Sequence, residues 1–247
     1  MKILVPISQV PDTTAKISFI NNDTTFNNAG VTFIINPYDE WYALVRALEL
    51  KEAGKAEKVT VIHVGPTENE PTIRKALAIG ADDAVRIDGD GDSSFVAGQI
   101  ADYAQKNDYS LILLGKETIS YNSAATAGLV AGFLDWNFVP YATKLDVNGN
   151  TISLEQEMDG GVNQLSSPLP LVVSAAKGMA LQRIPNMRGI MAARTKPLQV
   201  VTPSTDFPVY TKVESYTPAK GRTACVMISE DNIDELVDLL HTKAKVI

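Results

Sequence analysis

Short, nearly continuous apolar runs alternate with segments of helical periodicity between residues 2 and 134. The runs span residues 2–7, 58–64, 84–87 and 111–114, and the helical patterns span residues 38–52, 67–80, 93–104 and 124–134. Strands buried on both faces of a parallel sheet have this continuous apolar character. The alternation therefore predicts an α/β fold with a doubly wound, mostly parallel sheet and right-handed crossovers. Thr67 with Glu70, and Ser93 or Ser94, are the expected caps of two helices.

Two groups of residues are expected to add antiparallel strands. Residues 17–20 and 31–35 are predicted to pair as a hairpin inserted before the first helix. A second hairpin is predicted around Asn148-Gly149-Asn150, because Asn-Gly is a strong hairpin signal. The strands beside this turn, and two more that follow, are expected over residues 144–147, 151–157, 162–165 and 169–174.

The periodic pattern ends near residue 197, and an extended arm is expected from there onward. Three prolines interrupt this stretch: Pro203, Pro208 and Pro218. A short helix near the C-terminus has one apolar face, formed by Ile233, Leu236, Val237 and Leu240. We therefore expect an α/β domain over residues 1–196 and a C-terminal arm over residues 197–247. The terminal helix needs a surface to dock on, either the chain's own core or a partner subunit.

Charge and residue counts exclude several functional classes. The chain has 22 Lys and Arg against 29 Asp and Glu, a net charge of −7, which argues against nucleic acid or an anionic membrane as its main partner. No apolar run reaches the ~20 residues of a membrane span, so membrane insertion is not expected. The single cysteine, Cys225, permits no intrachain disulfide and no thiolate metal site. Neither His63 nor His241 accompanies a nucleophile-elbow sequence, so no catalytic residues are expected.

Two segments resemble ligand-binding motifs without meeting their requirements. Residues 115–118 follow an apolar run, but Ser110 stands where the first glycine of a phosphate-binding loop is required. Residues 88–92 open like a calcium loop, but Ser93 replaces its essential glycine. A solvated turn is the expectation for residues 88–92.

The predicted topology itself selects a candidate site. In an open parallel sheet, ligands bind beyond the carboxyl ends of the strands, where the strand order reverses. Three segments are expected there: residues 6–14, 64–67 and 115–126. The last segment is small and polar and leads into a helix, whose N-terminal amides suit a phosphate group. The alternative is a simple helix cap.

Several stretches of the chain match one known family in both order and spacing. They are Val10-Pro11-Asp12 with Lys16, and residues 36–40, 72–82, 113–116, 159–161, 169–170 and 183–191, together with Thr223-Ala224. Over nearly its whole length the sequence resembles the beta subunit of electron transfer flavoprotein. The resemblance implies a heterodimer with an alpha subunit, which takes electrons from flavin dehydrogenases such as acyl-CoA dehydrogenase and delivers them to a quinone-linked or other acceptor.

The resemblance also implies the cofactors. The alpha subunit would hold most of an FAD that both subunits share, and this chain would carry a buried AMP and supply no catalytic residue, because the flavin performs the redox chemistry. The expected location is the cytoplasm of a bacterium, or the mitochondrial matrix only for a processed form. One alternative is the electron-bifurcating branch of the family, with a second FAD in place of AMP. Another is a universal-stress-like nucleotide-binding module that acts alone.

Residue by residue, the resemblance places the AMP contacts at Pro6, Asn36, Val64, Gly65, Gly115, Asn122, Ser123, Ala124, Ala125 and Thr126. Asn36 has an alternative role as the cap of a helix that starts at Pro37. Tyr38 matches an aromatic residue near the flavin, with the core face of its helix as the alternative. Asp12 is expected to accept a hydrogen bond near the flavin or to cap the turn after Pro11.

The sequence departs from the family at three of these places. Family members with AMP commonly have Asn-Gln-Thr where this chain has Ala124-Ala125-Thr126, and an acidic pair where it has Ser120-Tyr121. Thr13 replaces a tyrosine that usually contacts the flavin. These replacements remove polar groups, so the nucleotide in this chain is expected to be AMP, a second FAD, or absent.

Residues 184–191 align with the family's loop that presents a bulky apolar residue to partner dehydrogenases. Met187 stands in the place of that residue, and methionine adapts well to a partner surface. The alternative for Met187 is a buried helix start. The expected partner contacts are Ile184, Met187, Arg188, Ile190 and Met191. Arg188 and Arg194 are expected to steer acidic partners.

Overall fold

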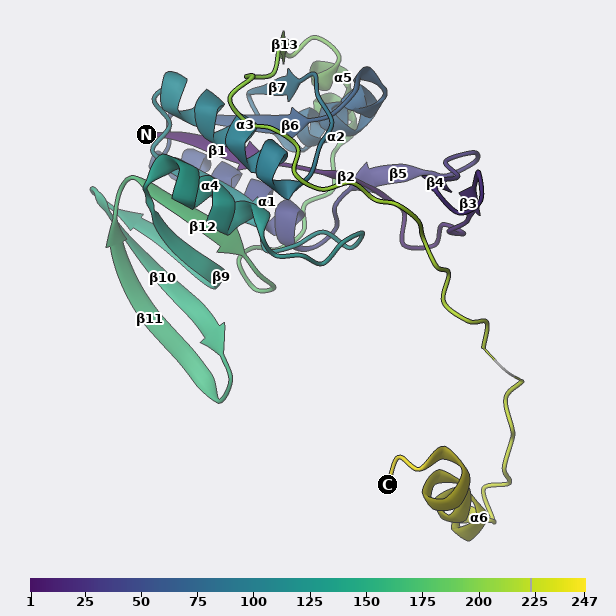
Figure 1. The fold of residues 1–247 in the computed structure, drawn as a ribbon. Coiled ribbons are helices and arrows are strands. Elements are labelled where there is room, and N and C mark those ends of the chain that lie inside the picture. The colour runs from purple at the N-terminus through teal and green to yellow at the C-terminus, as the bar shows by residue number, and fades with distance from the viewer. Residues whose placement is uncertain (223) are drawn as a thin grey trace. The chain divides into compact units, whose positions relative to one another are not determined.

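A nine-stranded sheet with helices on both faces forms the larger of two units (Figure 1). The structure is a computed structural model that describes residues 1–222 and 224–247, so Thr223 of the Thr223-Ala224 match lies outside the described residues. The larger unit comprises residues 1–17 and 27–214, and the smaller unit comprises residues 18–26 and 215–247.

The strand order of the sheet is β11-β10-β9-β12-β8-β1-β6-β7-β13. Its strands are β1 (Lys2–Pro6), β6 (Lys58–Val64), β7 (Asp83–Ile87), β8 (Leu111–Gly115), β9 (Asn137–Asn148), β10 (Thr151–Met158), β11 (Gly161–Pro168), β12 (Leu171–Ala175) and β13 (Leu198–Val201). All neighbours pair in parallel except β9 with β10 and β10 with β11. The predicted fold class, the four apolar strands and the hairpin at Asn148-Gly149-Asn150 are confirmed.

The helices divide between the two faces of the sheet. They are α1 (Asp39–Glu52), a 3₁₀ turn η1 (Thr67–Asn69), α2 (Glu70–Ile79), α3 (Ser93–Lys106), α4 (Thr126–Leu134) and α5 (Met187–Ala193). Residues of α1 and α2 share one apolar core with Ile3 and Val5 of β1, whereas residues of α3 and α4 share the other core with Leu4. Successive side chains of a strand point to opposite faces, so a strand covered on both sides is apolar throughout.

The expected pairing of residues 17–20 with residues 31–35 is wrong. Instead, β3 (Phe19–Ile20) pairs with β4 (Thr25–Phe26), and β2 (Gln9–Pro11) pairs with β5 (Phe33–Ile35). Asn21, Asn22 and Asp23 all adopt positive φ, which asparagine and aspartate tolerate better than most residues. These three residues turn the chain back at once, so β3 meets β4 before it can reach β5.

Three local expectations are corrected as well. The side chain of Asp92, rather than that of a serine, caps α3 by accepting a 3.0 Å hydrogen bond from the amide of Phe95. Thr67 makes no capping box, because the hydroxyl oxygen accepts a hydrogen bond from Arg86 at the start of a 3₁₀ turn. Helix α4 begins at Thr126, two residues later than predicted, because Ala124 adopts a φ of 50°.

The smaller unit combines the β3–β4 hairpin with the end of the chain. The ring of Phe19 stacks on that of Tyr216 at a centroid distance of 4.3 Å, and the amide of Tyr216 donates a 2.7 Å hydrogen bond to the carbonyl of Asp23. Helix α6 (Ile233–Leu239) and a π-helical turn (Leu240–Ala244) follow near the C-terminus. The predicted terminal helix is confirmed, and its apolar residues Ile233 and Val237 are exposed.

Candidate functional site

The strand order reverses beside β1, at the centre of the sheet. The chain proceeds from β1 to β6 and β7 on one side, and then crosses to β8 on the other side of β1. The carboxyl ends of β1, β6 and β8 therefore lie next to one another, and each is followed by a segment that the sequence selected: residues 6–14, 64–67 and 115–126. This edge is where open α/β sheets bind ligands.

Asn36 ties two of these loops together. It is 1% exposed, its amide donates a 3.1 Å hydrogen bond to the carbonyl of Ser8, and its Nδ2 donates one of 2.9 Å to the carbonyl of Glu117. Its Oδ1 accepts a 2.9 Å hydrogen bond from the amide of Ile119. Helix α1 begins at Asp39 without a side-chain cap, so the alternative role of Asn36 as a helix cap is wrong.

Glu40 is a buried carboxyl group at the same edge, which the sequence reasoning missed. Its two oxygens accept hydrogen bonds from the amide of Ser8 at 2.7 Å and from the hydroxyl of Ser8 at 2.5 Å. Burial raises the pKa of Glu40 to about 8, against the opposing effect of the two Ser8 hydrogen bonds. Gly115 packs against it, because a Cβ at residue 115 would lie 2.6 Å from the Glu40 Cγ.

One signal could have found Glu40. It lies three and four residues before Ala43 and Leu44, which are both fully buried, so it shares the apolar face of α1. Beside it, the half-buried Asp39 has a pKa that desolvation raises to about 6 and that Lys116 lowers in part. The amine of Lys116 also lies 3.1 Å from the carboxylate of Glu117.

The loop after β6 packs against the buried side chain of His63 and the half-buried side chain of Asn69. Gly65 lies against His63 and Asn69 so closely that no side chain would fit there. Nδ1 of His63 lies 2.9 Å from the carbonyl of Ile7, and its Nε2 lies 2.8 Å from the Nδ2 of Asn69. Burial lowers the pKa of His63, so a neutral ring that donates to Ile7 and accepts from Asn69 fits both contacts.

Arg86 of β7 also holds this loop. Its buried guanidinium donates hydrogen bonds to the carbonyl of Gly65, to the hydroxyl of Thr67 and to the carboxylates of Glu70 and Asp88. Because it has these four partners, we assign it a structural role. Sequence reasoning did not single out Arg86, since three of its four partners lie in residues 65–70, which only the fold brings beside it.

The remaining predicted cofactor residues occupy the three loops in different ways. Pro6 is buried at the end of β1, and Val64 is half-buried at the end of β6. Asn122 and Ser123 are exposed, whereas Ala124, Ala125 and Thr126 are half-buried at the start of α4. The cap residue Ala125 makes no side-chain hydrogen bond to the first amides of this helix.

The residues expected near a flavin lie at the surface. Tyr38 is 59% exposed with a φ of 64°, so its alternative place on the core face of the helix is wrong. The carboxylate of Asp12 accepts hydrogen bonds from the amide of Thr14 at 2.9 Å and from its hydroxyl at 2.6 Å, which is the turn-capping role. Thr13 is exposed beside it.

The predicted partner contacts form an exposed apolar group at α5. Ile184 and Met187 are 83% and 73% exposed, and Ile190, Met191 and Arg188 are also exposed. Met187 is the first residue of the helix, so a buried helix start is the wrong description of it.

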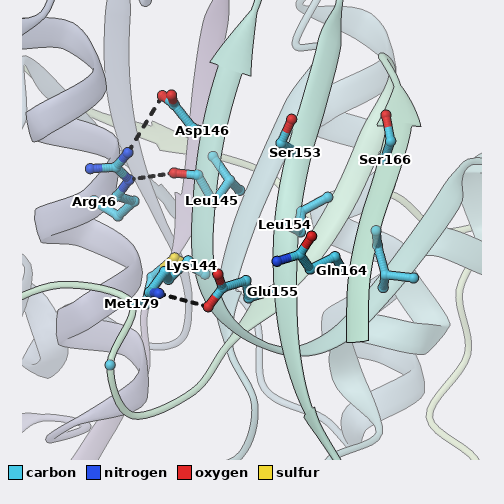
Figure 2. Close-up of a pocket in the computed structure, with 12 residues that line it drawn as sticks. Arg46, Lys144, Leu145, Asp146, Ser153, Leu154, Glu155, Gln164, Ser166 and Met179 are labelled. Atoms are coloured by element: carbon cyan, nitrogen blue, oxygen red, sulfur yellow. Dashed lines mark hydrogen bonds and ion pairs between the residues drawn. The ribbon is translucent and has the colours of Figure 1, made fainter. Parts of the chain in front are cut away.

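A separate concavity of about 780 Å³ lies over β9, β10 and β11, beside α1 (Figure 2). It contains none of the predicted site residues. Lys144 pairs with Glu155 at 2.7 Å, and Nη2 of Arg46 lies 3.7 Å from the carboxylate of Asp146. Its charged groups are thus engaged with one another, and we do not place the functional site there.

Residues 1–222 and 224–247 contain neither a membrane-spanning helix nor a cluster of metal-binding side chains. No helix in these ranges has the length and apolar character needed to cross a membrane. Within the same part of the chain, no three His, Cys, Asp or Glu side chains gather in a way that could hold a metal ion.

Comparison with known proteins gives a consistent result. The family model of the electron transfer flavoprotein domain matches residues 23–206. The mitochondrial electron transfer flavoprotein subunit beta of Oryza sativa subsp. indica is 34% identical to this chain over the full length of both. The corresponding subunit beta of Bacillus subtilis is 32% identical, again over both full lengths. That of Homo sapiens is 31% identical over 97% of this chain and 98% of its own.

Proposed function

The chain belongs to the electron transfer flavoprotein family, as a relative of its beta subunits, and from this premise we propose that it works as one half of an electron-carrying heterodimer. An alpha subunit is the other half, and the two share one FAD. The complex takes electrons from flavin dehydrogenases, such as acyl-CoA dehydrogenase, and passes them to a quinone-linked or other acceptor. We place it in the bacterial cytoplasm, or in the mitochondrial matrix if the chain is a processed form.

The observation that carries this proposal is the edge where β1, β6 and β8 end. Asn36 and Glu40 hold the loops after β1 and β8 in one arrangement, and the first amides of α4 lack a side-chain cap. Uncapped helix amides suit a phosphate group. We therefore assign AMP to this edge, with Pro6, Asn36, Val64, Gly65, Gly115 and residues 122–126 around it.

Asn36 would act there by holding the loop, since both ends of its side-chain amide are bonded to residues 117 and 119. Residues 124 and 125 are alanines, so the polar groups that residues 122–126 offer to AMP are the side chains of Asn122, Ser123 and Thr126 and the backbone amides.

The flavin supplies the redox chemistry when it is bound, so this chain needs to orient and shield it rather than to exchange protons or form covalent bonds. Tyr38 presents an exposed ring at the same edge as the nucleotide loops, and Asp12 and Thr13 lie in the exposed turn after β2. We assign these three residues to the flavin side of the site. The chain is thus a carrier subunit without catalytic residues of its own.

Two further surfaces are assigned to protein partners. The proposed arm over residues 197–247 begins with β13, which belongs to the sheet, and carries α6 near its end. The exposed Ile233, Leu236 and Val237 of α6 would dock on the alpha subunit. Ile184, Met187, Arg188, Ile190 and Met191 would contact the dehydrogenase. Arg188 and Arg194 would attract an acidic rim on that partner, chiefly raising the association rate.

Co-expression with the alpha subunit tests the proposal. We expect a yellow 1:1 complex, while this chain purified alone binds flavin poorly. Mass spectrometry of the nucleotides released on denaturation should find FAD and AMP in equal amounts. Two FAD per complex would favour the bifurcating alternative. A stable monomer that needs no partner and binds no flavin would contradict the proposal.

A further inference from the structure

Residues 183–196, called the docking segment below, are tied to the rest of the larger unit at both ends while apolar side chains in between are exposed. The segment contains α5, which packs beside α2 (Figure 1). Ile184, Met187 and Met191 are 83%, 73% and 67% exposed. Exposed apolar side chains on an ordered backbone are a common mark of a protein contact surface.

The first end of the docking segment is tied to α1. The indole Nε1 of Trp41 donates a 3.1 Å hydrogen bond to the carbonyl of Arg183. The guanidinium of Arg183 binds both carboxylate oxygens of Glu52, at 2.6 and 3.1 Å. A two-pronged pair of this kind fixes direction as well as distance.

The second end is tied to α2 by two cations, one on each element, which donate hydrogen bonds to backbone carbonyls of the other element. Arg74 of α2 donates hydrogen bonds from Nη1 to the carbonyls of Ala193 and Lys196, at 2.8 and 2.6 Å. The amine of Lys196 in turn donates to the carbonyl of Leu77, at 3.0 Å, and to that of Ala81. These carbonyls lie at the C-terminal end of α2, where a positive charge is favoured.

The middle of the segment rests directly on the backbone of α2. Gly189 lies over the carbonyl of Ala78, and a Cβ at residue 189 would collide with that oxygen. Asn186 caps α5 by accepting a 2.8 Å hydrogen bond from the amide of Gly189. Contacts to backbone atoms cannot be relieved by a change of rotamer, so only glycine allows this approach.

We propose that Arg74, Arg183 and Lys196 are positioning residues, which hold the docking segment in its binding shape before any partner arrives. The partner then meets Ile184, Met187 and Met191 on an ordered backbone and does not have to order the segment itself, which preserves affinity. The ordering of the segment is a property of this chain alone, whereas its use by a dehydrogenase rests on the proposed function.

Hydrogen–deuterium exchange of the heterodimer tests the ordering without any partner dehydrogenase. We expect the amides of residues 188–193 to exchange at least about tenfold more slowly than an unstructured chain. Lys196→Met and Gly189→Ala should remove most of this protection, and Arg74→Lys should remove part of it. Lys106→Met, which breaks an exposed ion pair with Asp102 on α3, is the matched control and should change nothing at α5. Unprotected amides in the unchanged protein, or protection that survives both substitutions, would overturn the inference.

Reduction of the heterodimer by acyl-CoA dehydrogenase tests the consequence. Lys196→Met and Gly189→Ala should raise the KM for the heterodimer by about tenfold, with kcat and flavin content unchanged, because only encounter and docking are impaired. The double variant Ile184→Ala/Met187→Ala should raise KM as well. Gly189→Ala should raise KM much less in this double variant than in the unchanged chain, because the apolar side chains that the ordered segment holds out to the partner are then missing.

The two readouts separate two kinds of failure. If Ile184→Ala/Met187→Ala leaves KM unchanged, the proposed dehydrogenase surface is wrong, and the exchange data alone judge the ties. If that variant raises KM while Gly189→Ala and Lys196→Met do not, the surface is right and the positioning role is overturned.

Discussion

The carboxyl edge of the sheet and the docking segment use polar groups in opposite ways. At the edge, the side chains of Asn36 and Glu40 are buried and bind the backbone of neighbouring loops. In the docking segment, the polar ties lie at the two ends, and apolar side chains such as Met187 are exposed between them.

This difference follows from what each region would bind. A nucleotide that stays bound can be surrounded by loops that are continuous with the core, so those loops and the core depend on each other. A partner that comes and goes needs exposed side chains, and only the backbone beneath them has to be fixed. Substitutions at the edge should therefore change stability and cofactor content, whereas those in the docking segment should change the local order of that segment and partner kinetics but not cofactor content.

The largest effect is expected from Gly115→Ala. The new methyl group would lie 2.6 Å from the Glu40 Cγ and 2.7 Å from its backbone nitrogen, so α1 or β8 has to move. We expect a loss of about 1–3 kcal/mol in the free energy of unfolding, together with loss of bound AMP. Urea unfolding and mass spectrometry of released nucleotides measure the two effects.

Gly132→Ala is the matched control for Gly115→Ala. Gly132 lies in α4 with no atom within 4 Å of the added Cβ, so alanine should be neutral or stabilising. If Gly115→Ala left the free energy of unfolding and the AMP content as unchanged as Gly132→Ala does, the carboxyl edge would accommodate a methyl group. The proposed difference between this edge and the docking segment would then be wrong.

Asn36→Ala should have the next largest effect. It removes the side-chain partners of the Glu117 carbonyl and the Ile119 amide. An unpaired buried group costs about 1–3 kcal/mol, and these two bonds are only partly buried, so we expect a loss near the lower end of that range. The midpoint temperature of thermal unfolding and the AMP content should both fall. Asn163→Ala, which removes an exposed 3.3 Å hydrogen bond to Gln156, is the control and should change neither. Loss of stability with full AMP content would restrict Asn36 to a folding role.

The central strands could be predicted because their signal is local. A run such as residues 58–64 is apolar along its whole length only when both faces are covered, and the structure places β6 over those seven residues. Strand pairing could not be predicted in the same way. The pattern of residues 17–20 predicts a strand but does not indicate which strand it pairs with, and the turn that follows β3 determines that partner. Strand β13 lies in a proline-rich stretch without a period, and only its pairing with β7 makes it a strand.

The candidate site was predictable to the same degree. Topology located its three loops, because parallel strands end at a common edge. Arg86 and Arg74 were missed, since a basic residue in a helix or strand has the same sequence signal whether it faces solvent or a buried carbonyl. Glu40 was missed although its spacing from Ala43 and Leu44 places it on the buried face of α1. Their roles depend on atoms that the fold brings from 20 to 120 residues away.

The pH dependence of stability gives a smaller effect with a defined sign. Glu40 has a pKa of about 8 in the folded chain, above the ordinary value of 4.5, so between these values the folded state binds more protons than the unfolded state. Stability should therefore fall as pH rises through this window, by at most about 1.4 kcal/mol per pH unit.

Glu40→Gln should flatten this fall, because glutamine keeps the shape of the side chain and does not titrate. Asp39, whose pKa is about 6, and His63, whose pKa burial lowers from 6.5, change their protonation mainly below pH 7, so the range from pH 7 to 8 isolates Glu40 best. Urea unfolding at several pH values measures the slope. An equal slope in both proteins would mean that another group titrates, and that Glu40 is not kept neutral at the edge.

The smallest effect on stability is expected from Arg183→Met, at the first end of the docking segment. Its ion pair with Glu52 is largely exposed, and such pairs contribute about 0–1 kcal/mol. The hydrogen bond from Trp41 to the carbonyl of residue 183 survives the substitution. The free energy of unfolding and the AMP content should thus match those of Lys106→Met, while the KM for reduction by the dehydrogenase rises modestly. A large loss of stability or nucleotide would show that the docking segment is coupled to the carboxyl edge, since α1 carries both Glu40 and Glu52, and that the two regions are not independent.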